Sequence, residues 1–208
     1  MDNDNSEETE KKELKVILLG ECGVGKTNII LRYMKNKFDE DSVSTTSSNY
    51  MMKSIEKGNK IYRLNVWDTA GQERFRSITK IFLQDSSIII LVYSINDMTS
   101  FRNLNYWYDI VKQNCRPNII IAIVGNKTDC YLEQEVPDEE AENYAKERNA
   151  IFKLISAKAD KRGIDALFDL ILDEYIERKI DEKINESQSV KISSTKFNKT
   201  KKKKRHLC

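Results

Sequence analysis

Residues Gly20–Thr27, "GECGVGKT", have the types and the spacing of a loop that binds phosphate. Glycines let the backbone fold into a nest whose N–H groups converge on phosphate oxygens, and the positive end of a following helix strengthens the attraction. Lys26 would reach the outer phosphates, and the Thr27 hydroxyl would ligate Mg²⁺. The alternative is a glycine-rich turn that happens to contain Lys-Thr. The residues expected at phosphate in this loop are Cys22, Gly23, Val24, Gly25, Lys26 and Thr27.

A second motif, "WDTAGQERF", contains groups suited to a metal ion and to a terminal phosphate. Asp68 can hold Mg²⁺ through a water molecule, and the Gly71 backbone can contact the terminal phosphate. Gln72 can orient an attacking water, which makes it the candidate catalytic residue. The alternative is a strand that ends in a polar turn.

Two further motifs, "GNKTD" and "SAK", indicate which base is bound. The Asp129 carboxylate can accept hydrogen bonds from both nitrogens on the Watson–Crick edge of guanine. Adenine would leave that buried charge unpaired, so a polar site of this kind rejects it strongly. The Ala157 N–H would bind the guanine oxygen. The residues expected at guanine in these motifs are Asn126, Lys127, Asp129, Ser156, Ala157 and Lys158.

The elements that must position these motifs are apolar strands that alternate with amphipathic helices. We expect strands over 14–20, 50–57, 60–67, 87–94, 119–125 and 151–156, and helices over 26–36, 73–83, 100–115, 137–148 and 163–184. The turn "EKGN" predicts an antiparallel hairpin of the second and third strands, and the others should lie parallel because helices separate them. This pattern predicts an α/β fold: a six-stranded, mostly parallel sheet with helices on both faces. Ligands of such sheets bind beyond the carboxyl ends of the strands, where the motifs lie.

These motifs resemble those of the Ras superfamily of small GTPases, and within it the Rab family, over about residues 14–180. The resemblance implies a P-loop small GTPase architecture, with Mg²⁺ as cofactor and GTP and GDP as substrate and product. It also implies a threonine that ligates Mg²⁺ only when the γ-phosphate is present. The family places it nineteen residues after the loop lysine, and Rab members twenty-three before the "DTAGQ" aspartate, so Thr45 fits both counts and Thr46 neither. Phe38 matches the aromatic residue that packs on guanine, or else is a core residue at a helix end.

Two departures from the Rab pattern lie in the switch segments that partners contact. "TSSNY" stands at 46–50 in place of "IGVDF", and "FLQDS" stands at 82–86 in place of "YYRGA". The predicted function is a Rab-like switch that hydrolyses GTP and regulates vesicle trafficking, with an exchange factor, a GTPase-activating protein and effectors as partners. The alternative is a nucleotide-binding scaffold whose altered switch no longer cycles. "GNKTD" disfavours a third class, a metabolic kinase.

The two ends of the chain differ in charge from the body. We expect an acidic flexible N-terminus at 1–13, a GTPase domain at 14–184 and a disordered basic tail at 185–208. The tail carries seven lysines and one arginine against one glutamate, and its single terminal Cys208 does not form a C-a-a-X box. A prenyl chain on Cys208 together with the basic run would supply two anchoring signals. The alternative is an unmodified basic tail that is nuclear-targeting or attracts RNA.

Composition limits the remaining classes. No apolar run approaches the roughly 20 residues of a membrane span, and the N-terminus has no basic or apolar targeting region. The four cysteines lack metal-ligand spacing and are expected to be free thiols. We therefore predict a cytoplasmic protein, peripheral on the cytosolic face of an endomembrane, with no nucleic acid partner.

Overall fold

The computed structural model describes residues 10–40, 49–68, 83–159 and 161–180. The chain divides into two compact units, residues 1–168 and residues 169–208. In the second unit, the described residues 169–180 are helical. The first unit contains the sheet and the predicted nucleotide motifs.

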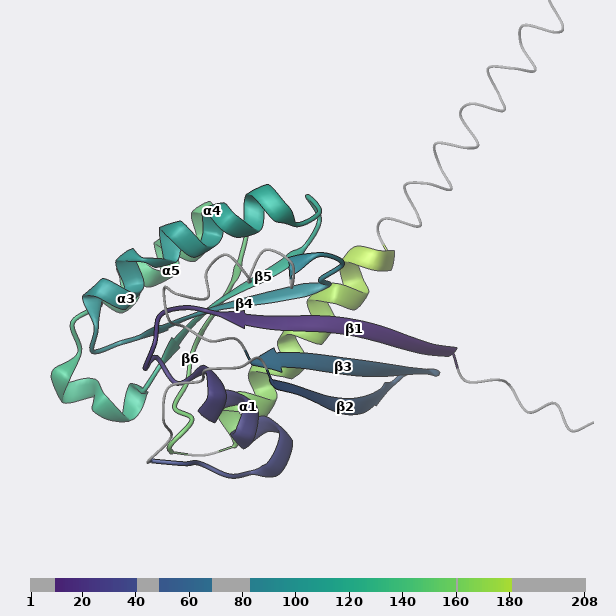
Figure 1. The fold of residues 1–208 in the computed structure, drawn as a ribbon, viewed down its shortest axis with the longest axis horizontal. Helices are drawn as coiled ribbons and strands as arrows, with labels where there is room; N and C mark the ends of the chain where they lie inside the picture. Colours follow the sequence, from purple (N-terminus) through teal and green to yellow (C-terminus); the bar gives the residue numbers. More distant parts are fainter. Residues whose placement is uncertain (1–9, 41–48, 69–82, 160, 181–208) are drawn as a thin grey trace, which may run out of the picture. The chain divides into compact units, whose positions relative to one another are not determined.

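The described part of the first unit is built on a six-stranded sheet with strand order β2-β3-β1-β4-β5-β6 (Figure 1). The strands are β1 (Glu10–Leu19), β2 (Asn49–Lys57), β3 (Lys60–Asp68), β4 (Ile88–Ser94), β5 (Ile120–Asn126) and β6 (Ile151–Leu154). β2 and β3 pair antiparallel, and the other neighbouring strands pair parallel. The predicted α/β class, the hairpin and the parallel pairing are confirmed.

Helices cover both faces of this sheet, as predicted. The described helices are α1 (Lys26–Lys35), α3 (Met98–Arg102), α4 (Leu104–Asn114) and α5 (Asp138–Glu147), and residues 162–168 are also helical. Figure 1 shows α1 on one side of the strands and α3, α4 and α5 on the other. On the α1 side, Tyr33 stacks on Phe168 with 3.7 Å between ring centroids. On the α4 side, Trp107 packs into the cluster that includes Tyr93 and Phe101.

The neighbouring strands β4 and β5 are buried along their whole length because both of their faces are covered. Every residue of Ile88–Ser94 and of Ile120–Asn126 is buried. β3 lies between β2 and β1, and its burial alternates along the strand from Tyr62 to Asp68. Parallel strands under two helical layers read as continuous apolar runs, whereas a strand with one covered face alternates.

The strand β1 begins at Glu10, four residues before the predicted start at residue 14. Its first residues pair with β3 from Glu10 opposite Lys60 onward. Opposite charges accompany this pairing, because Lys60 Nζ lies 2.5 Å from Glu10 and Arg63 Nη1 lies 3.1 Å from Glu13. A hydrogen bond from Asn65 lowers the pKa of the Glu13 carboxyl. Residues 10–13 of the N-terminal segment that we predict to be flexible are therefore part of a strand.

The helices differ from prediction in two places among the described residues. The single helix predicted over 100–115 is two helices, α3 and α4, that meet at Asn103. Asp97 caps α3 by accepting a hydrogen bond of 3.0 Å from the Ser100 N–H, which fixes a helix start that periodicity did not show. A 3-10 helix over Thr128–Glu133 was not predicted. The predicted helix over 73–83 lies almost wholly outside the described residues, as do residues 181–184 of the last one.

Two predictions from composition can be compared with the described residues. Cys22, Cys115 and Cys130 are free thiols there, as expected, and Cys208 lies outside. Among the helices described, none combines the length and the hydropathy that a membrane crossing requires.

Candidate nucleotide-binding site

The predicted phosphate loop connects β1 to α1 and depends on glycine at several positions. Gly20, Gly23 and Gly25 all have positive φ, with values of 146°, 80° and 94°. Gly25 is the N-cap of α1, and a Cβ atom there would clash with the Asn126 side-chain nitrogen. A side chain at Gly25 is therefore excluded both by the backbone conformation and by a neighbour in another motif.

Lys26 is folded back into this loop. Its side chain is 6% exposed, and Nζ donates to the carbonyl oxygens of Gly20 at 2.9 Å and Glu21 at 2.8 Å. Burial lowers the pKa of Lys26 to about 8, and the negative charge of Asp68 partly offsets the effect. The loop thus holds a poorly solvated cation, which is suited to bind an anion.

Thr27 and Asp68 bring two oxygen groups together from different elements. The Thr27 hydroxyl donates to Asp68 Oδ2 at 2.8 Å, and Asp68, the last residue of β3, is 3% exposed. Hydroxyl and carboxylate oxygens are ligands that Mg²⁺ accepts, and Mg²⁺ at nucleotides uses one or two carboxylates together with phosphate oxygens. In the described ranges, no group of three or more His, Cys, Asp or Glu side chains gathers to hold a metal. This pair fits a shared magnesium site and not an all-protein metal cage.

Asn126, at the end of β5, joins the phosphate loop to the "SAK" segment. It is 2% exposed; Nδ2 donates to the Val24 carbonyl at 2.8 Å, and Oδ1 accepts from the Ala157 N–H at 3.1 Å. The sequence predicted the Ala157 N–H for the guanine oxygen. In the structure this N–H donates to Asn126, so a guanine oxygen would have to share it or displace the amide.

Asp129 is oriented by Ser156. The Ser156 hydroxyl donates to Asp129 Oδ1 at 2.5 Å and accepts from the Ala159 N–H at 2.9 Å. Cys130 Sγ donates to Asp129 Oδ2 at 3.7 Å, and burial, followed by the charge of Asp129, raises the pKa of this thiol. Lys127, at φ 68°, starts the 3-10 helix that contains Asp129. Ser156 is therefore placed to position Asp129, a role that the sequence did not predict for it.

The last predicted guanine residues lie nearer the surface. Lys158 Nζ donates to Glu40 at 2.7 Å, and this bond raises the pKa of Lys158. Both side chains are exposed, so the pair contributes little by itself. Phe38 is half-buried and lies in the segment between α1 and Glu40. Thr45, Gly71, Gln72 and Cys208 lie outside the described residues.

Three polar residues contact these motifs although the sequence did not identify them. Glu21 of the phosphate loop accepts a hydrogen bond of 3.1 Å from the Trp107 indole N–H on α4. Asn28 of α1 binds the backbone of Asp39, which follows Phe38, and Arg32 of α1 binds the Ala157 carbonyl in the "SAK" segment. The one available signal was polarity at Asn28 in the otherwise apolar "NIIL" that begins α1, because a buried polar side chain requires a partner.

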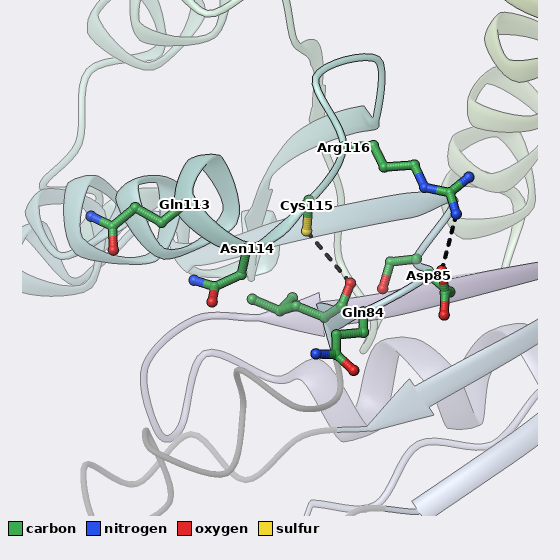
Figure 2. Close-up of a pocket in the computed structure, with 8 residues that line it drawn as sticks. Gln84, Asp85, Gln113, Asn114, Cys115 and Arg116 are labelled. Carbon is green, nitrogen blue, oxygen red and sulfur yellow. Dashed lines mark hydrogen bonds and ion pairs between the residues drawn. The ribbon is translucent and has the colours of Figure 1, made fainter.

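A cavity of about 370 Å³ lies apart from these motifs (Figure 2). It is lined by residues 83–86, before β4, and by residues 113–116, at the end of α4. Asp85 has a left-handed φ of 57° where the "YYRGA" pattern has glycine, and its carboxylate lies 3.1 Å from Arg116. The Cys115 thiol donates to the Leu83 carbonyl at 3.7 Å, and burial raises its pKa to about 11. This cavity contains no predicted nucleotide residue, and it lies at the start of a strand, whereas the nucleotide motifs follow strand ends.

Comparison with known proteins gives consistent matches. A model of the Ras family matches residues 15–177, which include all the predicted nucleotide motifs. Ras-related protein Rab-22A of Homo sapiens is 40% identical over 147 residues, or 71% of this chain and 76% of that protein. Ras-related protein Rab-21 of Homo sapiens is 42% identical over 154 residues, or 74% and 68%. Ras-related protein Rab-31 of Mus musculus is 40% identical over 157 residues, or 76% and 80%.

Proposed function

Because the chain belongs to the Ras family and is a Rab-like small GTPase, we propose that it is a GTP/GDP switch that regulates intracellular vesicle trafficking. It is a GTP hydrolase, as members of this family are, and such proteins generally act with exchange factors, activating proteins and effectors. The observation that carries the proposed site is the position of Asn126. One buried side chain binds both the phosphate loop and the "SAK" segment, so the phosphate groups and the base would be held by one connected unit.

On the phosphate side, the loop N–H groups and Lys26 would bind the outer phosphates. Thr27 and Asp68 would hold Mg²⁺, the latter through water, and Thr45 would complete the set when the γ-phosphate is present. Mg²⁺ supplies neutralisation of the charge that develops on the phosphate oxygens. The lowered pKa of Lys26 supports this role, because an anion would restore the favourable environment that burial removes.

On the base side, Asp129 would select guanine through its two Watson–Crick nitrogens. The hydrogen bond from Ser156 orients this carboxylate and supports its assignment, and Phe38 would pack on the ring. Asn126, Lys127, Ala157 and Lys158 would complete the guanine contacts. Asp129 is exposed in the structure, and a bound base would cover its carboxylate. Adenine would cover it without offering the two N–H groups of guanine, and we therefore expect adenine to be rejected.

For hydrolysis, Gln72 would orient the attacking water, and the Gly71 N–H would bind the γ-phosphate. Both residues lie outside the described ranges, so their assignment depends on the motif "WDTAGQERF" alone. We expect the isolated protein to hydrolyse GTP slowly. A partner that inserts an arginine should accelerate hydrolysis by a factor on the order of 10³–10⁵.

Membrane association would come from the C-terminal segment. Its lysines would attract an anionic leaflet at about 1 kcal/mol per basic residue near the surface, and Cys208 is the candidate for lipidation. Attachment through this segment alone would hold the GTPase domain at the cytosolic face of an endomembrane.

Single-turnover hydrolysis of GTP by the purified protein tests the proposed reaction. Gln72→Leu should nearly abolish hydrolysis and leave GTP affinity unchanged, because leucine packs but cannot orient water. Asn114→Ala, on α4, serves as a control that should hydrolyse at the parental rate. A Gln72→Leu variant that hydrolyses GTP as fast as the parent, with and without an activating protein, would contradict the assigned role.

A further inference from the structure

The helix α1 carries two polar residues, Asn28 and Arg32, whose side chains hold two separate segments of the chain. They are four residues apart, so they lie on one face of the helix, one turn from each other. α1 begins at the phosphate loop, with Gly25 as its N-cap. Whatever these side chains bind is therefore fixed relative to the phosphate loop.

Asn28 binds the backbone of Asp39 in both directions. Its Nδ2 donates to the Asp39 carbonyl at 2.9 Å, and its Oδ1 accepts from the Asp39 N–H at 2.9 Å. The side chain is part of the buried region, with 7% exposed. An amide can satisfy a donor and an acceptor of one residue together, whereas a hydroxyl or a carboxylate cannot match both in this geometry. Asp39 directly follows Phe38, so this pair of hydrogen bonds fixes the residue proposed to pack on guanine.

Arg32 binds the "SAK" segment from the same face. Nε donates to the Ala157 carbonyl at 2.9 Å, and Nη2 donates to the Lys158 carbonyl at 3.2 Å. Nη1 donates to the Asn36 carbonyl, at the C-cap of α1, at 3.2 Å. The guanidinium group thus spans from the end of the helix to the segment after β6. Hydrogen bonds from a charged donor are stronger than neutral ones, and the planar fork suits two adjacent carbonyls.

A third contact joins the two held segments to each other. Lys158 Nζ lies 2.7 Å from the Glu40 carboxylate, one residue beyond Asp39. Because both groups are exposed, this ion pair is weak compared with the buried bonds of Asn28. The ion pair thus links, at the surface, the two segments that α1 holds: residues 38–40 and residues 156–158.

We propose that Asn28 and Arg32 are positioning residues that set the lifetime of bound guanine nucleotide by fastening both base-side segments to α1. This inference rests on the proposed function, since it assumes that Phe38 and the "SAK" segment contact the base. Neither residue touches the reacting groups; each acts through the segment that it holds. Movement of either segment away from a bound base must break two or more of these hydrogen bonds.

The test is the rate of GDP dissociation from the purified full chain, measured by chase with excess unlabelled GDP. Asn28→Ala removes two hydrogen bonds and should accelerate release by about tenfold. Arg32→Ala should accelerate it by a similar factor, and Arg32→Lys should recover only part, because one ammonium cannot reproduce the fork. Asn114→Ala and Arg148→Ala are matched controls. Each removes side-chain bonds to a backbone carbonyl away from the site and should leave release within about twofold of the parent.

Two readouts separate positioning from a general loss of structure. In a Phe38→Ala background, Asn28→Ala should accelerate release far less than in the parent, because the group that it positions is gone. Affinity for ribose 5-diphosphate, which lacks the base, should be the same for both variants and the parent. Three results would each overturn the inference. Asn28→Ala could accelerate GDP release as much in the Phe38→Ala background as in the parent, or the variants could bind ribose 5-diphosphate more weakly than the parent does. The third result is a rate of GDP release that neither substitution changes. A parent chain that retains no guanine nucleotide would instead overturn the proposed function.

Discussion

The phosphate side and the base side of the proposed site are built from different kinds of interaction. On the phosphate side, the glycines of the loop have positive φ, the buried Lys26 binds backbone carbonyls of the loop, and the buried Asp68 accepts from the Thr27 hydroxyl. On the base side, side chains from separate elements hold short segments together, and the outermost pair, Lys158 and Glu40, is exposed. The conformation of the phosphate loop should therefore tolerate almost no side chain at Gly20 or Gly25, whereas the lifetime of the bound base should be adjustable through the side chains that hold the base-side segments.

This difference suggests where members of one family could vary without losing their chemistry. A Cβ at Gly20 would collide with the Val92 carbonyl, and a Cβ at Gly25 would collide with Asn126. A changed Asn28 or Arg32 would leave the loop intact and alter only how long a nucleotide stays. If the two sides are separable in this way, a substitution on one side should leave the other side's binding unchanged.

The largest effect is expected on the base side, from Asp129→Asn. Loss of the carboxylate should weaken GDP binding on the order of 10⁴-fold, because both guanine nitrogens lose their acceptor. Binding of xanthosine diphosphate should rise, since its protonation pattern suits an amide, and this rise would show that the phosphate side is undisturbed. Competition binding with both nucleotides measures it. A variant that binds GDP as the parent does would show that Asp129 does not contact the base.

On the phosphate side, Thr27→Asn should weaken the Mg²⁺-dependent part of GTP binding by roughly 10²-fold. The hydroxyl that lies 2.8 Å from Asp68 would be replaced by an amide of different length and direction. Thr27→Ser keeps the hydroxyl and is the matched control, with near-parental affinity. Titration with GTP measures the affinity with Mg²⁺ and without it. If the ratio of the two affinities is the same for Thr27→Asn as for the parent, Thr27 is not a ligand of the metal.

Protonation of Lys26 offers a test of the phosphate side that needs no substitution. Its pKa is about 8 in the free protein, and phosphate should raise it, so binding takes up a proton above pH 8. We expect GDP affinity to be level below about pH 7 and to fall about 30-fold by pH 9.5, as the free lysine loses its proton. Calorimetry in buffers of different ionisation enthalpy would measure the proton uptake.

The same lysine should affect stability in the opposite direction. Its pKa in the folded protein lies below the ordinary lysine value of 10.5, so between pH 8 and pH 10.5 the unfolded chain binds more protons at this residue. The contribution of Lys26 to the stability of the nucleotide-free protein therefore increases with pH across that window.

For the affinity prediction, the contradicting result is a GDP affinity that stays constant up to pH 9.5. In that case Lys26 would not be the cation that binds phosphate.

The smallest effect is expected from Glu40→Gln. This change removes the exposed ion pair with Lys158 and leaves the bonds of Asn28 in place, so GDP release should accelerate less than about fivefold. The same small effect should appear in the parent at high salt. Acceleration as large as that of Asn28→Ala would show that surface charge, and not the buried amide, holds the base-side segment.

How much the sequence could predict depends on whether the signal was local. β4 and β5 were predictable because apolar runs buried on both faces need no distant information. The phosphate loop was predictable because glycine, lysine and threonine stand at fixed spacing in consecutive residues. The start of β1 was missed because its charged residues are held by β3, about fifty residues away. The link between Asn28 and Asp39 was missed for a similar reason, since a side chain bound across a connecting segment leaves no periodic trace.

The hydrogen bond from Trp107 to Glu21 has a practical consequence for spectroscopy. The chain contains two tryptophans, and the other, Trp67, directly precedes Asp68 in β3. Indole emission depends on the polarity around the ring and on the partner of its N–H group. Each fluorophore is thus adjacent to a different phosphate-side residue, so exchange of nucleotide could be followed by intrinsic fluorescence, without a label, and replacing either ring by phenylalanine would assign the signal to one motif.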